Sequence, residues 1–137
     1  MNRRYARLTG VPEIPVKKTS GEILTQAVSD YIETHYRDKF SLESLAGELY
    51  VNGSYLLRVF KKHTGYTPLA YHNHVRCERA KELLAGSGNN VSEIGEAVGF
   101  VSSAHFSHVF RKETGCTPTE YRNRQKDGSA GLPESNN

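Results

Sequence analysis

Residues 59–71 read VFKKHTGYTPLAY, and residues 109–121 read VFRKETGCTPTEY. In each stretch a Val-Phe pair and a basic pair are followed by a glycine and then by a Thr-Pro step. Glycine is a common residue just past the end of a helix, and proline is favoured in the first turn of the next one. The chain therefore predicts, twice, a helix that stops at its glycine and a new helix that starts at its proline.

The similarity extends beyond these stretches. Residues 51–74 and 101–124 are identical at ten of 24 positions, at an offset of 50. Upstream the offset is 49, because Ser41 aligns with Asn90, so the second copy holds one extra residue, which we place at Gly99-Phe100. Each copy reads as a short helix, a tight turn and a second helix, which is the helix-turn-helix pattern. Two copies are too few for a solenoid, which needs about three or more units.

Further helices flank the two copies. Apolar residues at helical spacing predict a first helix over residues 22–36, with a stripe made of Ile23, Ala27, Val28, Tyr31, Ile32 and Tyr36. No segment alternates convincingly with a period of two, so no sheet is expected. The predicted fold is all-α and homeodomain-like, with about seven helices that form two helix-turn-helix subdomains joined by a long linker helix.

The predicted boundaries follow from the turn signals. Gly and Pro residues in the first 20 positions indicate a lead-in or linker, and the polar, Gly/Pro-containing C-terminus indicates a flexible tail. The expected segments are a lead-in at 1–20, the first subdomain at 21–67, the linker helix at 68–85, the second subdomain at 86–124 and the tail at 125–137.

Composition favours a foldable cytoplasmic protein. The 137 residues carry a net charge of +3 and a pI near 8.9, which alone favours a nucleic-acid partner only weakly. No apolar run approaches the ~20 residues that span a bilayer, so no membrane partner is expected. Nothing at the N-terminus resembles a secretion signal, and the two cysteines show no metal or redox spacing.

The second helix of the first copy has one apolar and one polar face. On a helical wheel, Leu56, Val59 and Phe60 fall together and are expected to face the core. Ser54, Arg58 and Lys61 fall opposite them, with Leu57 at the border. Arg58 has the geometry to bind guanine O6 and N7 together, and Leu57 can contact a thymine methyl group.

The second helix of the second copy repeats this arrangement. Phe106, Val109 and Phe110 face inward, whereas Ala104, His108 and Arg111 point outward and Ser107 lies at the border. Neither outward face carries an acidic residue, as a helix that approaches phosphates and base edges requires. Four basic residues lie where the walls of a major groove would be: Lys61, Lys62, Arg111 and Lys112.

Over roughly residues 22–124, which include both helix-turn-helix copies, the chain resembles the DNA-binding domain of the AraC/XylS family of bacterial transcription regulators. The Arg76-x-x-Arg79-Ala80-x-x-Leu83-Leu84 stretch is similar to the linker helix of that family. The Gly99-Phe100 pair and the ending Phe110…Gly115-x-x-Pro118…Tyr121-Arg122 are similar to its most specific signature. The motifs occur in the right order and at the right spacing.

The resemblance implies a unit that binds double-stranded DNA as a monomer, across two successive major-groove segments. A helix from Leu69 to Leu84 is about 24 Å long, and with a subdomain at each end it can hold two reading helices about one DNA turn, ~34 Å, apart. By position, the base-reading candidates are Ser54, Leu57, Arg58, Ser103, Ala104, Ser107 and His108. The phosphate-contact candidates are Tyr55, Lys61, Lys62, His105, Arg111 and Lys112.

Two departures from the family concern the second subdomain. Gly95 stands where the family usually has alanine, and this would weaken its helix by up to ~1 kcal/mol. Ala104, Ser107 and His108 are weaker base readers than Gln, Thr or Arg. We therefore expect the first subdomain to supply most of the base specificity.

Other chemistry is not expected. His72, His74 and Cys77 are close in sequence but do not supply three or four ligands in tetrahedral reach, so no metal is predicted. No phosphate loop, HExxH or G-x-S-x-G motif occurs, which argues against an enzyme and against a cofactor.

Two alternatives stay open at this point. The first concerns function, because a helical protein-interaction module without DNA binding would share the same frame. The second concerns the extent of the chain, which is either a small stand-alone regulator or, as we favour, the C-terminal part of a longer one. The resemblance implies a partner RNA polymerase if the protein is an activator, and a small-molecule effector or a receiver domain only if a longer chain exists.

Overall fold

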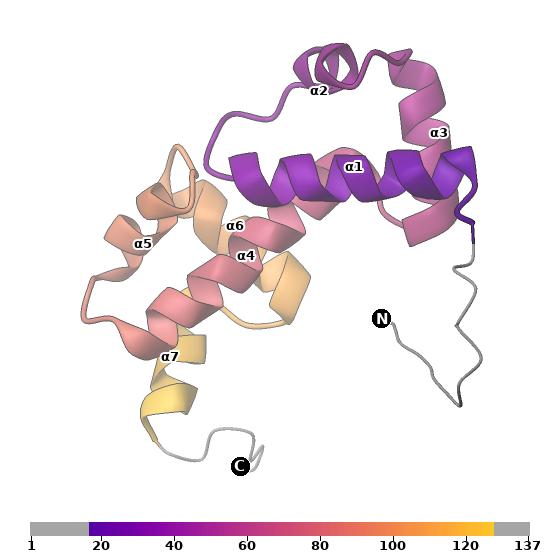
Figure 1. Cartoon of the computed structure of the whole chain (residues 1–137). Coiled ribbons are helices and arrows are strands. Elements are labelled where there is room, and N and C mark those ends of the chain that lie inside the picture. Colours follow the sequence, from indigo (N-terminus) through magenta and orange to yellow (C-terminus); the bar gives the residue numbers. More distant parts are fainter. Residues whose placement is uncertain (1–16, 128–137) are drawn as a thin grey trace, which may run out of the picture.

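Seven α-helices make up the part of the chain, residues 17–127, that the computed structural model describes. Within these residues no strand occurs, which confirms the predicted all-α fold. The helices are α1 (Ser20–His35), α2 (Leu42–Glu48), α3 (Gly53–Thr64), α4 (Pro68–Gly86), α5 (Val91–Ala97), α6 (Ser103–Thr114) and α7 (Pro118–Lys126). In Figure 1, α1–α3 lie at one end of α4 and α5–α7 lie around its other end.

Side-chain caps define where each helix begins. A Thr, Ser or Asn side chain accepts a backbone N–H of the first turn in every helix, through Thr19, Ser41, Asn52, Thr67, Asn90, Ser102 and Thr117. Gly65 and Gly115 end α3 and α6 in the left-handed conformation, with φ of 82° and 91°. The helix-stop and helix-start signals of the repeated stretch are thus confirmed.

Two separate apolar cores hold the helices together. The first core is made of Val28, Ile32, Leu45, Ala46, Leu56, Phe60 and Val75. The second core is made of Cys77, Ala80, Leu84, Ile94, Val98, Phe100, Phe106 and Phe110. Because Val75 belongs to the first core and Cys77 to the second, α4 changes its buried face midway and completes both cores. It is therefore an integral wall of each subdomain as well as a connection between them.

The position of the extra residue in the second copy differs from the prediction. Val51 donates its N–H to the carbonyl of Ala46, and Phe100 donates to the carbonyl of Gly95 in the same way. Val51 and Phe100 are therefore equivalent, and the inserted residue is Val101, which follows the predicted pair. Val101 is 94% exposed, which is why the insertion leaves the second core intact.

Smaller corrections concern the ends. Ile23 was predicted on the apolar stripe of the first helix but is 57% exposed, and Leu24 packs against the first core instead. The flexible tail was predicted from residue 125, but α7 continues to Lys126. The rest of that tail and nearly all of the predicted lead-in, residues 128–137 and 1–16, lie outside the described residues.

Gly95 has a packing role that the sequence did not indicate. A Cβ at Gly95 would lie 2.6 Å from Cδ2 of Phe106, a side chain that is fully buried. The equivalent pair in the first copy is Ala46 and Leu56, both in the first core. The second copy thus combines a smaller residue on its first helix with a larger one on its second, so the glycine makes room for the phenylalanine ring.

We expect Gly95→Ala to lower the free energy of unfolding by roughly 1–3 kcal/mol because it overpacks this contact, although alanine is the better helix former. Chemical denaturation measures the change. The double variant Gly95→Ala, Phe106→Leu restores the pairing of the first copy and should recover most of the loss. A single variant as stable as the wild-type chain would contradict this account.

Candidate nucleic-acid interface

The outer face of α3 is open to solvent. Leu56, Val59 and Phe60 are buried, as the helical wheel predicted. Ser54, Tyr55, Leu57 and Arg58, with Lys61 and Lys62 one turn further on, are exposed. The helix begins at Asn52, whose Oδ1 accepts the N–H groups of Ser54 and Tyr55 at 2.9 and 3.2 Å. The cap fixes the first turn, which carries Ser54 and Tyr55, and Leu57 and Arg58 follow in the next turn.

Arg58 has a neighbour that the sequence reading did not assign to it. Its guanidinium carbon lies 5.2 Å from the centre of the Tyr55 ring, a cation–π contact between residues i and i+3 of α3. This contact restricts the rotamers of a long side chain before any ligand arrives, so less entropy is lost on binding. The i, i+3 spacing of an aromatic and an arginine was the available sequence signal.

The outer face of α6 carries smaller side chains than that of α3. Ser103, Ala104 and His108 are exposed, whereas Ser107 is half-buried. The ring of His105 packs edge-on against Phe100, with 5.4 Å between ring centres. The structure thus places the seven base-reading candidates on two exposed helix faces, with Ser107 the least accessible of them.

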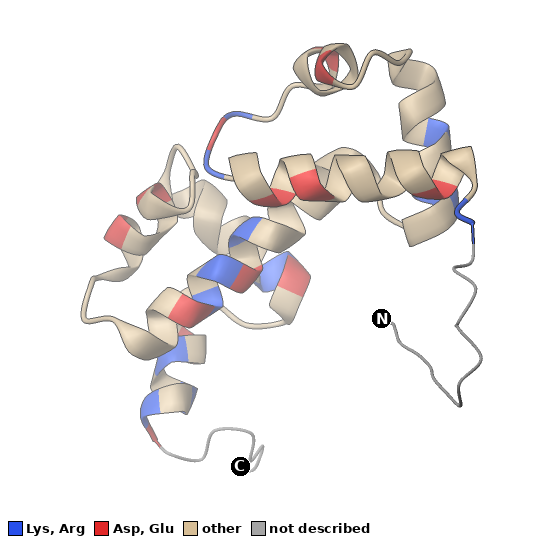
Figure 2. Ribbon diagram, in the orientation of Figure 1, with Lys and Arg blue, Asp and Glu red and all other residues tan. Residues whose placement is uncertain are grey.

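The charged residues of α3 and α6 that have no partner of opposite charge are basic. Lys61, Lys62, Arg111 and Lys112 are all exposed in the second half of their helices. No acidic residue lies on α3, as the absence of red along it shows in Figure 2. The single acidic residue of α6, Glu113, bonds to Nδ1 of His74 on α4, at 2.5 Å. The carboxylate of Glu113 is therefore bonded to a side chain of the linker helix α4.

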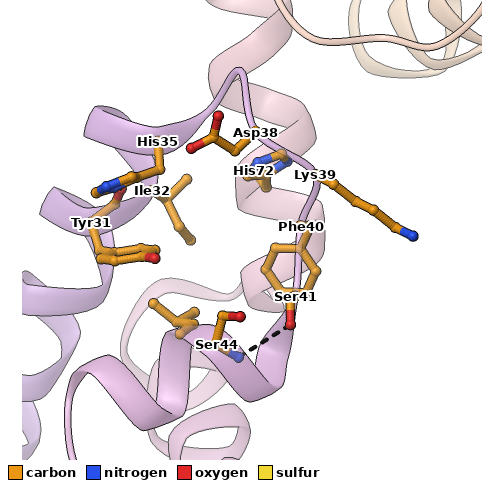
Figure 3. Close-up of a pocket in the computed structure, with 10 residues that line it drawn as sticks. Tyr31, Ile32, His35, Asp38, Lys39, Phe40, Ser41, Ser44 and His72 are labelled. Atoms are coloured by element: carbon orange, nitrogen blue, oxygen red, sulfur yellow. Dashed lines mark hydrogen bonds between the residues drawn. The ribbon is translucent and has the colours of Figure 1, made fainter.

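A small cavity lies between α1, the α1–α2 loop, α2 and α4 (Figure 3). Its volume is about 40 Å³, far below the ~300 Å³ of an ordinary small-molecule site. His72 of α4 lines it and is only 3% exposed, and its Nδ1 has no hydrogen-bond partner. Burial, and then the positive charge of Arg76, lower the pKa of His72 from 6.5 to about 4, and the backbone of Asp38 and His35 offsets this only in part.

His72 of the first copy corresponds to an arginine in the second copy. The equivalent residue of the second copy is Arg122, at the offset of 50. Arg122 donates from Nε to the carbonyl of Leu84 at 3.1 Å and from Nη2 to that of Ser87 at 3.2 Å. A neutral imidazole has one donor where the guanidinium has five. A neutral His72 therefore cannot donate to two carbonyls at once, as Arg122 does.

The low pKa of His72 predicts acid sensitivity. The unfolded chain binds this proton below about pH 6.5 and the folded chain only near pH 4, so its contribution is complete above pH 6.5 and is lost as the pH falls. Between pH 7.5 and 5 the loss is about 2 kcal/mol. Urea denaturation of wild-type and His72→Gln chains at both pH values tests this. A variant that is as acid-sensitive as the wild-type chain would show that His72 is not responsible.

The histidine and cysteine residues that are close together in the sequence of α4 are buried or bonded to other residues. Cys77 is fully buried, and burial raises its pKa to about 12, so its thiol stays protonated. His74 bonds to Glu113. Within residues 17–127, no group of three or more His, Cys, Asp or Glu side chains is placed to hold a metal ion. Across the same residues, no helix has the length and apolar character needed to cross a membrane.

Residues 45–124 match a family described as a helix-turn-helix domain, and this match covers more than half of the chain. The fold and the two exposed second helices agree with that class. Within it, the chain belongs to the AraC/XylS type of bacterial regulators, because the solved structures that it resembles include AraC-type DNA-binding domains.

Three relatives illustrate the similarity. The transcriptional activator RhaS of Escherichia fergusonii is 38% identical over 75 residues, 55% of this chain and 27% of RhaS. A transcriptional regulator of Chromobacterium violaceum with an AraC-type DNA-binding domain has a TM-score of 0.72 at 29% identity, covering 76% of this chain and 93% of that one. The DNA-binding domain of AdpA, a global transcriptional factor solved with a target DNA, has a TM-score of 0.69 at 28% identity, covering 81% and 97%.

The match to full-length relatives is partial. The chain spans less than a third of the length of the curated relatives first matched. The similarity thus concerns their helix-turn-helix region.

Proposed function

We propose that the chain binds double-stranded DNA sequence-specifically and regulates transcription, with α3 and α6 in two successive major-groove segments. The observation that carries this proposal is the presence of two exposed helices, free of unpaired acidic side chains, on one α4 frame. Each of these helices carries a basic pair in its last turn. The AdpA domain, which is similar over 81% of this chain, is solved with its target DNA, and this supports the proposal.

In this proposal the two helices have different roles in base reading. On α3, Ser54, Leu57 and Arg58 read bases, and Arg58 supplies the strongest single contact through guanine. On α6, Ser103, Ala104, Ser107 and His108 face the groove, mostly through small side chains that allow close approach. Phosphates are bound by the candidates flanking these faces: Tyr55, Lys61, Lys62, His105, Arg111 and Lys112.

The partners follow from the same proposal. Duplex DNA is the ligand, and no catalysis is proposed. The similarity to the activator RhaS supports a role in activation. We propose that activation takes place through contact with RNA polymerase, in the bacterial cytoplasm. If the chain is part of a longer regulator, an effector-binding or receiver domain controls it.

Two roles of Tyr55 in DNA binding can be distinguished: its ring orients Arg58, or its hydroxyl group binds a phosphate. If the ring orients Arg58, Tyr55→Phe keeps DNA affinity, whereas Tyr55→Ala lowers it by about 0.5–1 kcal/mol. If instead the hydroxyl group binds a phosphate, both variants lose affinity to a similar extent. Fluorescence anisotropy on the preferred duplex distinguishes these results.

Selection from a pool of random duplexes tests the proposed function. We expect an enriched motif with two conserved segments whose centres are about 10 base pairs apart. Affinity for this motif should fall steeply with salt, since each neutralised phosphate adds about −0.9 to the log–log slope. The absence of an enriched motif, with weak and salt-insensitive binding, would favour a protein-interaction module instead.

A further inference from the structure

One arginine of α4 lies where the two subdomains meet. Arg76 is only 7% exposed. Its Nε donates to the carbonyl of Tyr36 at 2.6 Å, and its Nη2 donates to the carbonyl of Asp38 at 2.8 Å. Both carbonyls belong to the connection that follows α1. Arg76 therefore fastens the first subdomain to the middle of the shared helix.

The same guanidinium also contacts the second subdomain. Its central carbon lies 5.2 Å from the ring centre of Phe100, a member of the second core. The preceding residue, Gly99, has a φ of 108°, and a Cβ there would lie 2.6 Å from the carbonyl oxygen of Arg37 and 2.9 Å from Nη2 of Arg76. The turn between α5 and α6 thus rests directly on the α1–α2 loop, with no room for a side chain.

Tyr36 completes this contact. It packs against both apolar cores, and the guanidinium carbon of Arg79 lies 5.6 Å from its ring centre. We call the group formed by Tyr36, the Arg37 and Asp38 carbonyls, Arg76 and the Gly99–Phe100 turn the joint. The planar guanidinium fork suits such a place because it binds two acceptors in a fixed geometry while its face stacks on a ring.

We propose that Arg76 is a positioning residue, which fixes the separation and rotation of α3 relative to α6 and so sets the spacing of the two DNA segments that the protein accepts. This inference rests on the proposed function. Moving one segment by a single base pair shifts it by about 3.4 Å along the DNA and rotates it by about 35°. If α4 alone connected the two subdomains, α3 and α6 could move relative to each other and follow part of that change. The joint prevents this relative movement.

Arg122 provides a matched control within the same chain. It binds two carbonyls through Nε and Nη2, as Arg76 does, but its partners Leu84 and Ser87 lie at the C-terminal end of α4, where this helix packs in the second core and not at the joint. Arg122→Met therefore removes a clamp of the same chemistry without opening the joint. Any effect of Arg76→Met on spacing that Arg122→Met lacks is specific to the joint.

The experiment measures affinity by fluorescence anisotropy for the wild-type chain, Arg76→Met and Arg122→Met. The duplexes carry the two selected segments at the selected spacing, at spacings changed by one or two base pairs, and with either segment scrambled. We expect the wild-type chain to prefer the selected spacing by about tenfold or more, equivalent to ~1.4 kcal/mol. Arg76→Met should reduce that preference below about threefold, equivalent to ~0.65 kcal/mol, while its affinity for single-segment duplexes stays at the wild-type level. Arg122→Met should keep the wild-type preference.

Other results overturn the inference. It fails if Arg76→Met keeps the tenfold preference, if it loses affinity equally for every duplex, or if the wild-type chain binds all spacings equally well. If Arg76→Met does not melt cooperatively, Phe100→Leu opens the joint from the other side, and an unchanged preference in that variant would overturn the inference. A wild-type chain that selects no duplex contradicts the proposed function itself, and it does so before any variant is compared.

Discussion

Replacing Lys61, Lys62, Arg111 and Lys112 together by glutamine is expected to lower DNA affinity by about 10³-fold at ~0.1 M salt. Each of these exposed side chains is proposed to neutralise one phosphate, so the log–log slope of affinity against salt should become shallower by about 3.6. The measurement is a salt titration of the variant and the wild-type chain on the same selected duplex. Glutamine keeps most of the side-chain length and removes only the charge.

A control variant removes the same number of charges elsewhere. Lys18, Lys39, Lys81 and Lys126 lie outside α3 and α6, in the segment before α1, the α1–α2 loop, α4 and α7. Their joint replacement by glutamine should change the slope by less than about one unit. Equal changes in the two variants would mean that affinity depends on net charge and not on the two proposed reading helices.

Arg58→Ala is expected to relax the base preference at one position of the site by about 1–3 kcal/mol, or roughly 5- to 150-fold. The expected loss is large because Arg58 is the one arginine on the outward reading face of α3 and is already oriented by Tyr55. His108→Ala removes a shorter side chain with fewer donors and should have a smaller effect. Affinities for all single-base variants of the selected site measure both changes.

The comparison tests which subdomain supplies specificity. A greater loss of base preference in His108→Ala than in Arg58→Ala would contradict the expectation that the first subdomain dominates. Arg58→Lys is a useful third variant, because it keeps the charge and loses the two-pronged geometry. It should keep the salt slope of the wild-type chain while it loses base preference.

The sequence was sufficient for the helices and for the faces they present. The prediction of the helices and their faces rested on strong local signals, which are glycine and proline at helix ends and apolar residues at helical spacing. The buried residues Leu56, Phe60, Phe106 and Phe110 were predicted correctly for that reason. Periodicity failed at Ile23, which lies about 140° from Val28 around the helix, whereas Leu24, one turn before Val28, packs against the first core.

The sequence singled out Arg76, Gly99 and Phe100 only through the family resemblance, and their role in holding the two halves together was not identified from it. The contact of Arg76 with the Tyr36 and Asp38 carbonyls joins residues about 40 positions apart, and no local pattern reports such a pair. From the sequence, Gly95 was predicted only to be a weak helix former, because helix propensity does not describe the ring of Phe106 that packs against it. The reading faces are thus local in origin, whereas their mutual arrangement depends on tertiary contacts.

In the proposed complex, α3 and α6 occupy successive major-groove segments of one duplex. Hydroxyl-radical footprinting of the selected site tests this most directly, because it reports protection of the backbone regardless of base sequence. We predict protection on one face of the duplex, in two regions that flank adjacent major-groove segments and whose centres lie about 10 base pairs apart. Protection limited to a single segment, or spread evenly around the duplex, would contradict the account.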